Sequence, residues 1–340
     1  MIRRRPLILA ALGGLAAPAT LRAQGAFPGR RVTIIVPYPA GGGLDLLTRA
    51  VAEHLQGVWG QPVVVENRPG GSTIPGADAV VRAAPDGHTL MLTADNTITS
   101  NPHLFRNLPH DPVRDLAPVT HLVDVHQMVV SSASLDARDM AGLVAAARAR
   151  PGQLNYGSFG PGSQPHLAFE MLKAEHRLDI VHITYRGLPQ VIPALLAGEI
   201  QMTLSGIASA GQHITSGRAR GLAVGRPTRF PTMPDVPTLA EAGFDSMDPR
   251  TWFGLFAPAA TPAAIVAQIQ EAVAAALRVP AIADRHLTPN GYTVHGSTPA
   301  AFAAFIREDL AYTERMLRMS GARVESGGAG GGSCRRQRTA

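Results

Sequence analysis

The chain has 340 residues, of which 45% are hydrophobic and only 5% aromatic, and its 35 glycines and 28 prolines indicate frequent turns. The formal net charge of +6 is misleading, because seven arginines lie in the first 23 and last 15 residues and no acidic residue accompanies them there. The remainder carries a net charge of about −1, which argues against the basic face that nucleic-acid binding requires. The length allows about two domains with sizeable cores.

Both ends of the chain differ in composition from the rest. Residues 1–23 have the order of a secretory signal peptide, with Arg3–Arg5 followed by the apolar run Leu7–Ala17. The paired arginines would also suit a twin-arginine exporter. Residues 326–340 are glycine-rich and predicted to be disordered, and they contain the only cysteine, Cys334, so no disulfide can form within the chain. We therefore expect an exported, periplasmic protein stabilised by its core alone.

A strand, a glycine loop and a helix follow one another near the start of the expected mature chain. Val32–Val36 is a β-branched run, and Gly41–Gly43 interrupts all regularity. From Leu44 onward apolar residues recur at helical spacing, with Asp45 in the first turn. Unpaired amides and the positive end of a helix dipole then meet at one point, which suits an anion. The alternative is a glycine loop that only makes a tight turn.

Strands and helices alternate along the rest of the chain, which indicates an α/β fold with largely parallel sheets and ligands at the carboxyl ends of the strands. The expected strands are Pro62–Glu66, Thr89–Thr93, Ala117–Val123, Met128–Ser131, Leu154–Tyr156, Ile180–Thr184, Ile200–Leu204, Gly221–Val224, Thr251–Ala257 and Tyr292–His295. The expected helices are Ile74–Ala84, one from the cap Asp139 through Ala149, Pro165–His176, Pro189–Ala197, Ser209–Ser216, one capped by Thr261 and opened by Pro262, and one from Pro299 to Met319. Ala94–Thr97 is expected to be a polar loop, and Pro227–Gly243 a structured excursion.

A second glycine loop, Gly160–Ser163, precedes the helix Pro165–His176 about 120 residues after the first. If the two halves of the chain face each other, two helix starts point into one cleft. Each start can bind a carboxylate, so a small acid would bridge the halves and favour their closure.

Several motifs resemble the Bug family of periplasmic binding proteins, which serve tripartite tricarboxylate transporters. They are Pro37–Gly42 with Asp45, Gly60–Gly70, Ala84–Gly87, Pro165–Leu167, Pro234–Thr238 and Trp252–Leu255 with Pro258. The likeness covers roughly Phe27 to Glu325 and keeps the family's motif order.

The resemblance implies a two-lobed type II periplasmic binding protein fold with a mainly parallel sheet in each lobe. The first lobe would comprise residues 24–124 and 251–325, and the second residues 125–250. Closure would bend the crossing segments near Val123–Met128 and Arg250–Phe253. The resemblance also implies binding of a small organic acid without metal, cofactor or catalytic residue. The implied partners are membrane transporter subunits, and a monomer is expected.

The ligand-binding candidates lie in the glycine loops and at strand ends: Tyr38, Ala40, Gly41, Gly42, Asp45, Asp95, Asn96, Ser158, Gly160, Gly162, Ser163, Tyr185, Gly187 and Ser205. Some have another interpretation, since Tyr38 can pack between prolines and Asp45 can cap its own helix. Ser163 can donate to a carboxylate and also cap the next helix. Arg186 is interpreted as a solvated charge at the rim rather than a buried anchor.

Four positions depart from the family pattern: Leu44, Asp95-Asn96, Pro161 and Ser205. They lie near the expected cleft and bear on the identity of the ligand. Asp95 would repel a second carboxylate unless it accepts a hydrogen bond from a ligand hydroxyl or amine.

Two other functions fit the same loops. A receptor that signals to a membrane sensor kinase needs the same closure. A secreted hydrolase or transferase would use Ser163 and His166, but no G-x-S-x-G nucleophile elbow accompanies them.

Overall fold

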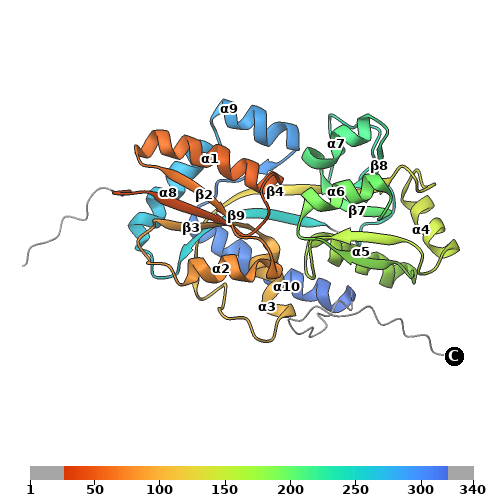
Figure 1. The fold of residues 1–340 in the computed structure, drawn as a ribbon, viewed down its shortest axis with the longest axis horizontal. Helices are drawn as coiled ribbons and strands as arrows, with labels where there is room; N and C mark the ends of the chain where they lie inside the picture. Colours follow the sequence, from red (N-terminus) through yellow and green to blue (C-terminus); the bar gives the residue numbers. More distant parts are fainter. Residues whose placement is uncertain (1–26, 248, 321–340) are drawn as a thin grey trace, which may run out of the picture.

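The computed structural model describes residues 27–247 and 249–320, and the expected signal peptide and tail lie outside these ranges. Two lobes lie side by side and are joined by long strands (Figure 1). One sheet order, β2-β1-β3-β9-β4-β7-β5-β6, runs through both lobes, and β10 and β8 pair with β4 outside this path. The expected two-lobed α/β fold is confirmed.

The first lobe is built on β1, β2 and β3, which are parallel, and on β9, β4 and β10, which are antiparallel to their partners. The second lobe continues from β4 with β7, β5, β6 and β8. Every antiparallel pairing involves β4 or β9, so the parallel part of each sheet is the strand–helix alternation read from the sequence. The strands are β1 Val32–Val36, β2 Val63–Asn67, β3 Thr89–Ala94, β4 Leu116–Ser132, β5 Asn155–Ser158, β6 Val181–Thr184, β7 Met202–Gly206, β8 Ala219–Val224, β9 Arg250–Pro258 and β10 Thr293–Val294.

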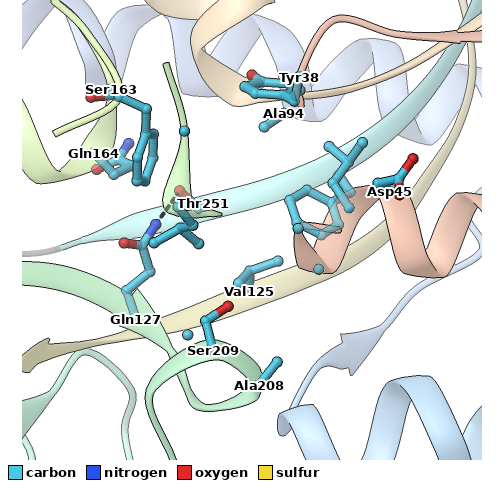
Figure 2. A pocket seen from close by; sticks show the side chains of 18 of the residues that line it. Tyr38, Asp45, Ala94, Val125, Gln127, Ser163, Gln164, Ala208, Ser209 and Thr251 are labelled. Atoms are coloured by element: carbon cyan, nitrogen blue, oxygen red, sulfur yellow. Dashed lines mark hydrogen bonds between the residues drawn. The ribbon is translucent and has the colours of Figure 1, made fainter. Parts of the chain in front are cut away.

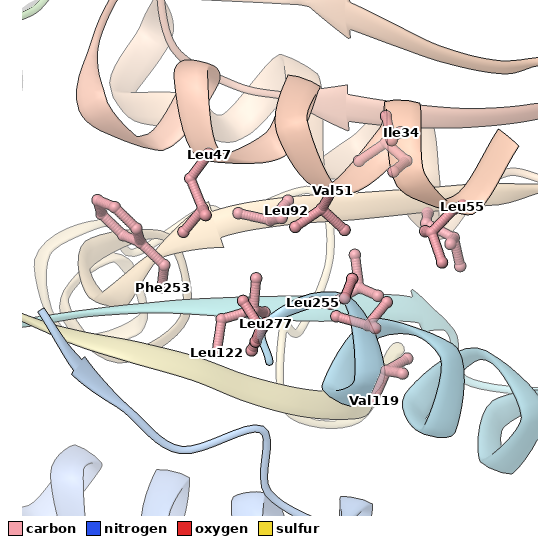
Figure 3. Close-up of a cluster of buried hydrophobic side chains, with 14 of the residues drawn as sticks. Ile34, Leu47, Val51, Leu55, Leu92, Val119, Leu122, Phe253, Leu255 and Leu277 are labelled. Carbon is pink, nitrogen blue, oxygen red and sulfur yellow. The ribbon is translucent and has the colours of Figure 1, made fainter. Parts of the chain in front are cut away.

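Helices cover both faces of each sheet. In the first lobe Leu47, Val51 and Leu55 of α1 pack over Ile34 and Leu92 of the sheet (Figure 3). Helices α2 and α10 cover the other face. The helices are α1 Gly43–Trp59, α2 Ile74–Val81, α3 Asn101–Leu104, α4 Met140–Ala149, α5 Gln164–His176, α6 Leu188–Ala197, α7 Ile207–Thr215, α8 Ala263–Ala276, α9 Pro280–Ile282 and α10 Pro299–Ser320, with short turns η1 Gly71–Thr73, η2 Asn96–Ser100, η3 Ala283–Leu287 and η4 Thr288–Asn290.

The C-terminal helix returns to the first lobe, as the resemblance implied. Phe302 and Ile306 of α10 pack with Trp252 and Phe256 of β9. Trp252 also donates its indole N–H to Asp309 of α10 over 2.9 Å. Helix α10 touches α5 of the second lobe as well, so this one helix contacts both halves of the molecule (Figure 1).

Three expected local structures are wrong. Ala117–Val123 and Met128–Ser131 are strands as expected, but the break expected between them is wrong: they are continuous in one 17-residue strand, β4, because the polar residues between them find partners in the neighbouring strands. The expected loop at Ala94–Thr97 begins a helical turn, η2, in which the Thr99 hydroxyl donates to the Asp95 carbonyl at 3.1 Å.

The third wrong expectation concerns the start of α8. Pro262 occupies the cap position without a side-chain hydrogen bond. The Thr261 hydroxyl, expected to cap this helix, is buried without a hydrogen-bond partner in the described structure.

Other expectations are confirmed. Asp139 caps α4 by accepting the Gly142 amide at 2.7 Å. The excursion Pro227–Gly243 is structured, since Phe230 and Met233 lie in the core of the second lobe. Within the described ranges no single helix is long and apolar enough to span a bilayer, and only α8 taken together with Pro280–Asn290, bent by 68°, meets that criterion.

Candidate functional site

A cavity of about 100 Å³ lies between the lobes, and helix starts surround it. The first turns of α1 and η2 reach it from the first lobe, and those of α5, α6 and α7 reach it from the second. Each start presents amides that lack intrahelical acceptors. The two helix starts expected to share a cleft, those of α1 and α5, border this one cavity.

The first glycine loop is held by Asp45. Gly41 has a φ of +86°, which favours glycine, and its amide donates to the Asp45 carboxylate over 2.9 Å. Arg49 and Asn67 donate to the same carboxylate. Burial opposes ionisation of Asp45, yet the bonds from Arg49, Gly41 and Asn67 lower its pKa. Asp45 thus fixes the loop, and Gly43, Leu44 and Asp45 of the first turn border the cavity.

The second glycine loop is satisfied mostly by its own residues. The Ser163 hydroxyl donates to the Gly160 carbonyl over 2.6 Å, and the Gly162 amide donates to Nδ1 of His166 over 3.0 Å. Burial, with a smaller contribution from neighbouring His182, lowers the pKa of His166 to about 4, so its ring is neutral and can accept this bond. Ser163 and His166 therefore have separate partners and do not form a nucleophile–base pair.

Asp95 joins the two lobes at one end of the cavity. It is 3% exposed, and Gln164 at the start of α5 donates to its carboxylate over 3.0 Å. Burial, together with the nearby Asp309, raises the pKa of Asp95 to about 7. Next to it, the Tyr38 hydroxyl donates to the Asn96 side-chain carbonyl. This end of the cavity therefore presents a buried carboxyl group beside the side chains of Tyr38 and Asn96.

The strands that connect the lobes, β4 and β9, form the floor of the cavity. Gln127 of β4 donates its amide N–H to the Thr251 hydroxyl of β9 over 2.9 Å (Figure 2). The Gln127 carbonyl oxygen is buried and has no hydrogen-bond partner among the described residues. Val125 and Phe253 add apolar floor surface. Within residues 27–247 and 249–320, no lysine or arginine borders this cavity.

Seven of the fourteen predicted residues border the central cavity: Tyr38, Gly42, Asp45, Asp95, Asn96, Ser163 and Gly187. Gly160 and Tyr185 line an adjacent cavity beside Arg186, and Gly41 lines a third. Ala40, Ser158, Gly162 and Ser205 border none of the three. Ser158 and Ser205 are buried, with hydroxyls bonded to His182 and to the Gly206 carbonyl.

Sequence analysis missed several residues that border the cavity, among them Gln127, Gln164, Thr251, Phe159 and Phe253. The only local signal for Gln127 is its position directly before the apolar run Met128-Val129-Val130. Thr251 and Gln164 have no comparable local signal, because tertiary contacts bring them to the site.

The lobes touch each other beside the cavity. Gly187 has extended backbone at the start of α6, and a Cβ built on it would lie 3.1 Å from Cδ of Pro39 in the first lobe. This approach and the Gln164–Asp95 bond lie beside the central cavity, so the structure describes a closed arrangement of the lobes.

The fold and the cavity between the lobes define a periplasmic-type solute-binding protein rather than an enzyme. Residues 47–321 match the family described as the tripartite tricarboxylate transporter family receptor, and the chain belongs to this family. BugT of Bordetella pertussis is 31% identical over 319 residues, which cover 94% of this chain and 97% of BugT.

Solved structures agree with this assignment. An R. palustris protein with adipate has a TM-score of 0.83 and 29% identity, covering 87% of this chain and 99% of the other. MatC from Rhodopseudomonas palustris, with bound malate, has a TM-score of 0.80 and 28% identity, covering 86% of this chain and 100% of the MatC chain.

Proposed function

We propose that this receptor captures a small carboxylate in the periplasm and delivers it to the membrane subunits of a tripartite tricarboxylate-type transporter. The observation that carries the proposal is the first turn of α1, which opens into a cavity walled by both lobes. The adipate and malate bound by its relatives support the ligand class.

The ligand carboxylate lies against the amides of Gly43, Leu44 and Asp45 in this proposal. The helix dipole contributes up to about 2 kcal/mol in a partly buried site. Each hydrogen bond from an amide to a charged group adds about 1.5–3 kcal/mol. No cationic side chain is needed, which agrees with the absence of lysine and arginine from the described cavity wall.

The far end of the ligand meets Asp95, whose ionised carboxylate accepts hydrogen bonds. That end therefore carries a donor such as a hydroxyl or an amine. A second carboxyl group fits when Asp95 is protonated and can donate to it, because two ionised carboxylates would repel each other. Hydroxy acids are expected to bind better than unsubstituted acids of equal length.

Closure is proposed as a hinge motion between a first lobe of residues 24–124 and 251–325 and a second lobe of residues 125–250. The segments Val123–Met128 and Arg250–Phe253 would bend. The pairing of β4 with strands of both sheets supports this division. Residues 1–23 are proposed to direct export, and the receptor is proposed to work as a monomer.

The test is to identify the ligand that accompanies the protein through native purification by mass spectrometry. The ligand-free protein is then screened by thermal shift against hydroxy acids, dicarboxylates, tricarboxylates and aromatic acids. We expect a co-purified organic acid that raises the Tm and binds at micromolar Kd or better, about −8 kcal/mol or more favourable. If no organic acid stabilises protein shown to be ligand-free, the proposal is wrong.

A further inference from the structure

Outside the cavity, a cluster of two histidines and one aspartate lies where β10 pairs with β4. His121 and Asp124 belong to β4, and His295 follows β10. Nε2 of His121 is 3.0 Å from one carboxylate oxygen of Asp124, and Nε2 of His295 is 2.8 Å from the other. All three candidate ligand atoms lie within 4.8 Å of one another.

A strand irregularity brings these side chains together. Residues three apart in a regular strand point to opposite faces of the sheet. The pairing of β4 with β9 shifts register between His121 and Val123, and such a bulge redirects the side chains around it. His121 and Asp124 consequently face each other.

His121 has a buried nitrogen without a hydrogen-bond partner. Its side chain is 5% exposed, and Nε2 makes no hydrogen bond among the described residues despite its closeness to Asp124. An unpaired ring nitrogen at this depth is costly. It points to a ligand at the position shared with Asp124 and His295.

The surroundings hold the three groups in place. The His121 ring stacks on His295 at 4.2 Å and on Phe305 at 4.6 Å between ring centroids. The backbone N–H of His295 donates to the Leu122 carbonyl over 2.9 Å, which ties the end of β10 to β4. The side chains of Asp124 and His295 are each about one-third exposed, at 34% and 35%, so an ion can enter from solvent.

We propose that His121, Asp124 and His295 form a binding site for a divalent transition-metal ion of the Zn²⁺ type. Two imidazoles and one carboxylate are ligands that Zn²⁺ prefers, whereas Mg²⁺ prefers oxygen alone. Three protein ligands leave a fourth position for water. The ion would join β10, and with it the start of α10, to the strand that crosses between the lobes.

The test uses untagged full-length protein that has been treated with EDTA, loaded with ZnCl₂ and passed over a desalting column. We expect one zinc per chain by elemental analysis and a Tm increase with ZnCl₂ that MgCl₂ does not reproduce. Loading with Co²⁺ should give the intense visible absorption of a four-coordinate ion. Zinc uptake no greater than that of the variant below, or equal stabilisation by Mg²⁺, would overturn the proposal.

His295→Ala is the informative variant, because His295 is exposed and its removal leaves the core intact. Losing a ligand should weaken Zn²⁺ binding by at least about 100-fold, since even a group that only supports a metal ligand is worth 10- to 100-fold. His103→Ala, at an exposed histidine of α3, is the matched control and should bind Zn²⁺ as the wild type does. Circular dichroism confirms that each variant is folded. Equal loss in both variants would mean adventitious surface binding and would contradict the site.

Discussion

The two glycine loops look alike in sequence, but their amides have different fates in the structure. In the first loop a carboxylate, Asp45, takes the Gly41 amide and leaves the first turn of α1 facing the cavity. In the second, the amides of Gly160, Gly162 and Ser163 all have acceptors nearby, which are the Ser158 hydroxyl, the neutral His166 ring and the Gly160 carbonyl. A glycine loop before a helix therefore does not by itself make an anion site, because side chains of the following turn decide which amides stay available.

Among the substitutions that test this difference between the loops, a negative charge in the first glycine loop should weaken ligand binding most. Gly42 borders the cavity, and a Cβ built on it meets no atom within 4 Å, so Gly42→Asp is tolerated and aspartate is a good helix cap. Repulsion of the ligand carboxylate should cost about 2–4 kcal/mol, which is roughly 30- to 1,000-fold in Kd by calorimetry. Gly42→Asn supplies the same shape without charge and should lose less than about tenfold. Equal losses in the two variants would contradict an anion at this loop.

Asp95, which contacts the start of α5, should make the unfolding free energy of the ligand-free protein depend on pH. Its pKa is raised from 3.8 to about 7, so between these values the folded state keeps a proton that the unfolded state has lost. Stability from this group therefore falls as pH rises from about 4 to 7 and is constant above that window. Asp95→Asn should remove this slope, worth about 2–3 kcal/mol between pH 5 and 7. Urea unfolding at several pH values measures it, and Gln164→Glu, which places a second carboxylate beside Asp95, should steepen the dependence.

Removing Asp45 should loosen the first loop. Asp45→Ala frees the Gly41 amide and leaves the Asn67 amide group with the Tyr38 carbonyl as its one remaining acceptor, so we expect a loss of about 1–3 kcal/mol in unfolding free energy and weaker ligand binding. Arg49→Ala removes only a half-exposed partner and should cost less than about 1 kcal/mol. If the two variants behave alike, the carboxylate acts through its ion pair and not through the loop.

The smallest effect on ligand binding is expected from a methyl group added where the two lobes touch. Gly187→Ala keeps an allowed backbone but places Cβ 3.1 Å from Pro39, so the closed state must shift by a few tenths of an ångström. We expect at most about tenfold weaker binding and a larger radius of gyration by small-angle scattering in the presence of ligand. Gly206→Ala is the control, since its Cβ would make an ordinary contact of 3.8 Å with Val125. No difference between the variants would mean that the lobes do not meet here on closure.

Most of the local structure can be predicted from the sequence. The strand Val32–Val36, the helix after Gly41–Gly43 and the cap Asp139 follow from spacing and side-chain type, and each is confirmed. The start of α8 was misjudged because Pro262 takes the cap position expected for Thr261. The roles of the fourteen candidate residues in ligand binding stay predictions.

Long-range pairs could not be predicted from one sequence. Gln127 meets Thr251 across 124 residues, and Gln164 meets Asp95 across 69. Both contacts depend on how β4, β9 and α5 are placed by the whole fold. For the same reason, the contact between His121 and His295 could not be predicted, because no local sequence pattern connects these two residues.

The central claim is that the first turn of α1 holds a carboxylate in a cavity shared by both lobes. A crystal structure of the protein with its co-purified acid tests it most directly. The account predicts a carboxylate within hydrogen-bond distance of the amides of Gly43 and Leu44, with the other end of the ligand near Asp95. A ligand bound instead in the neighbouring cavity beside Arg186, with those amides facing only water, would contradict it.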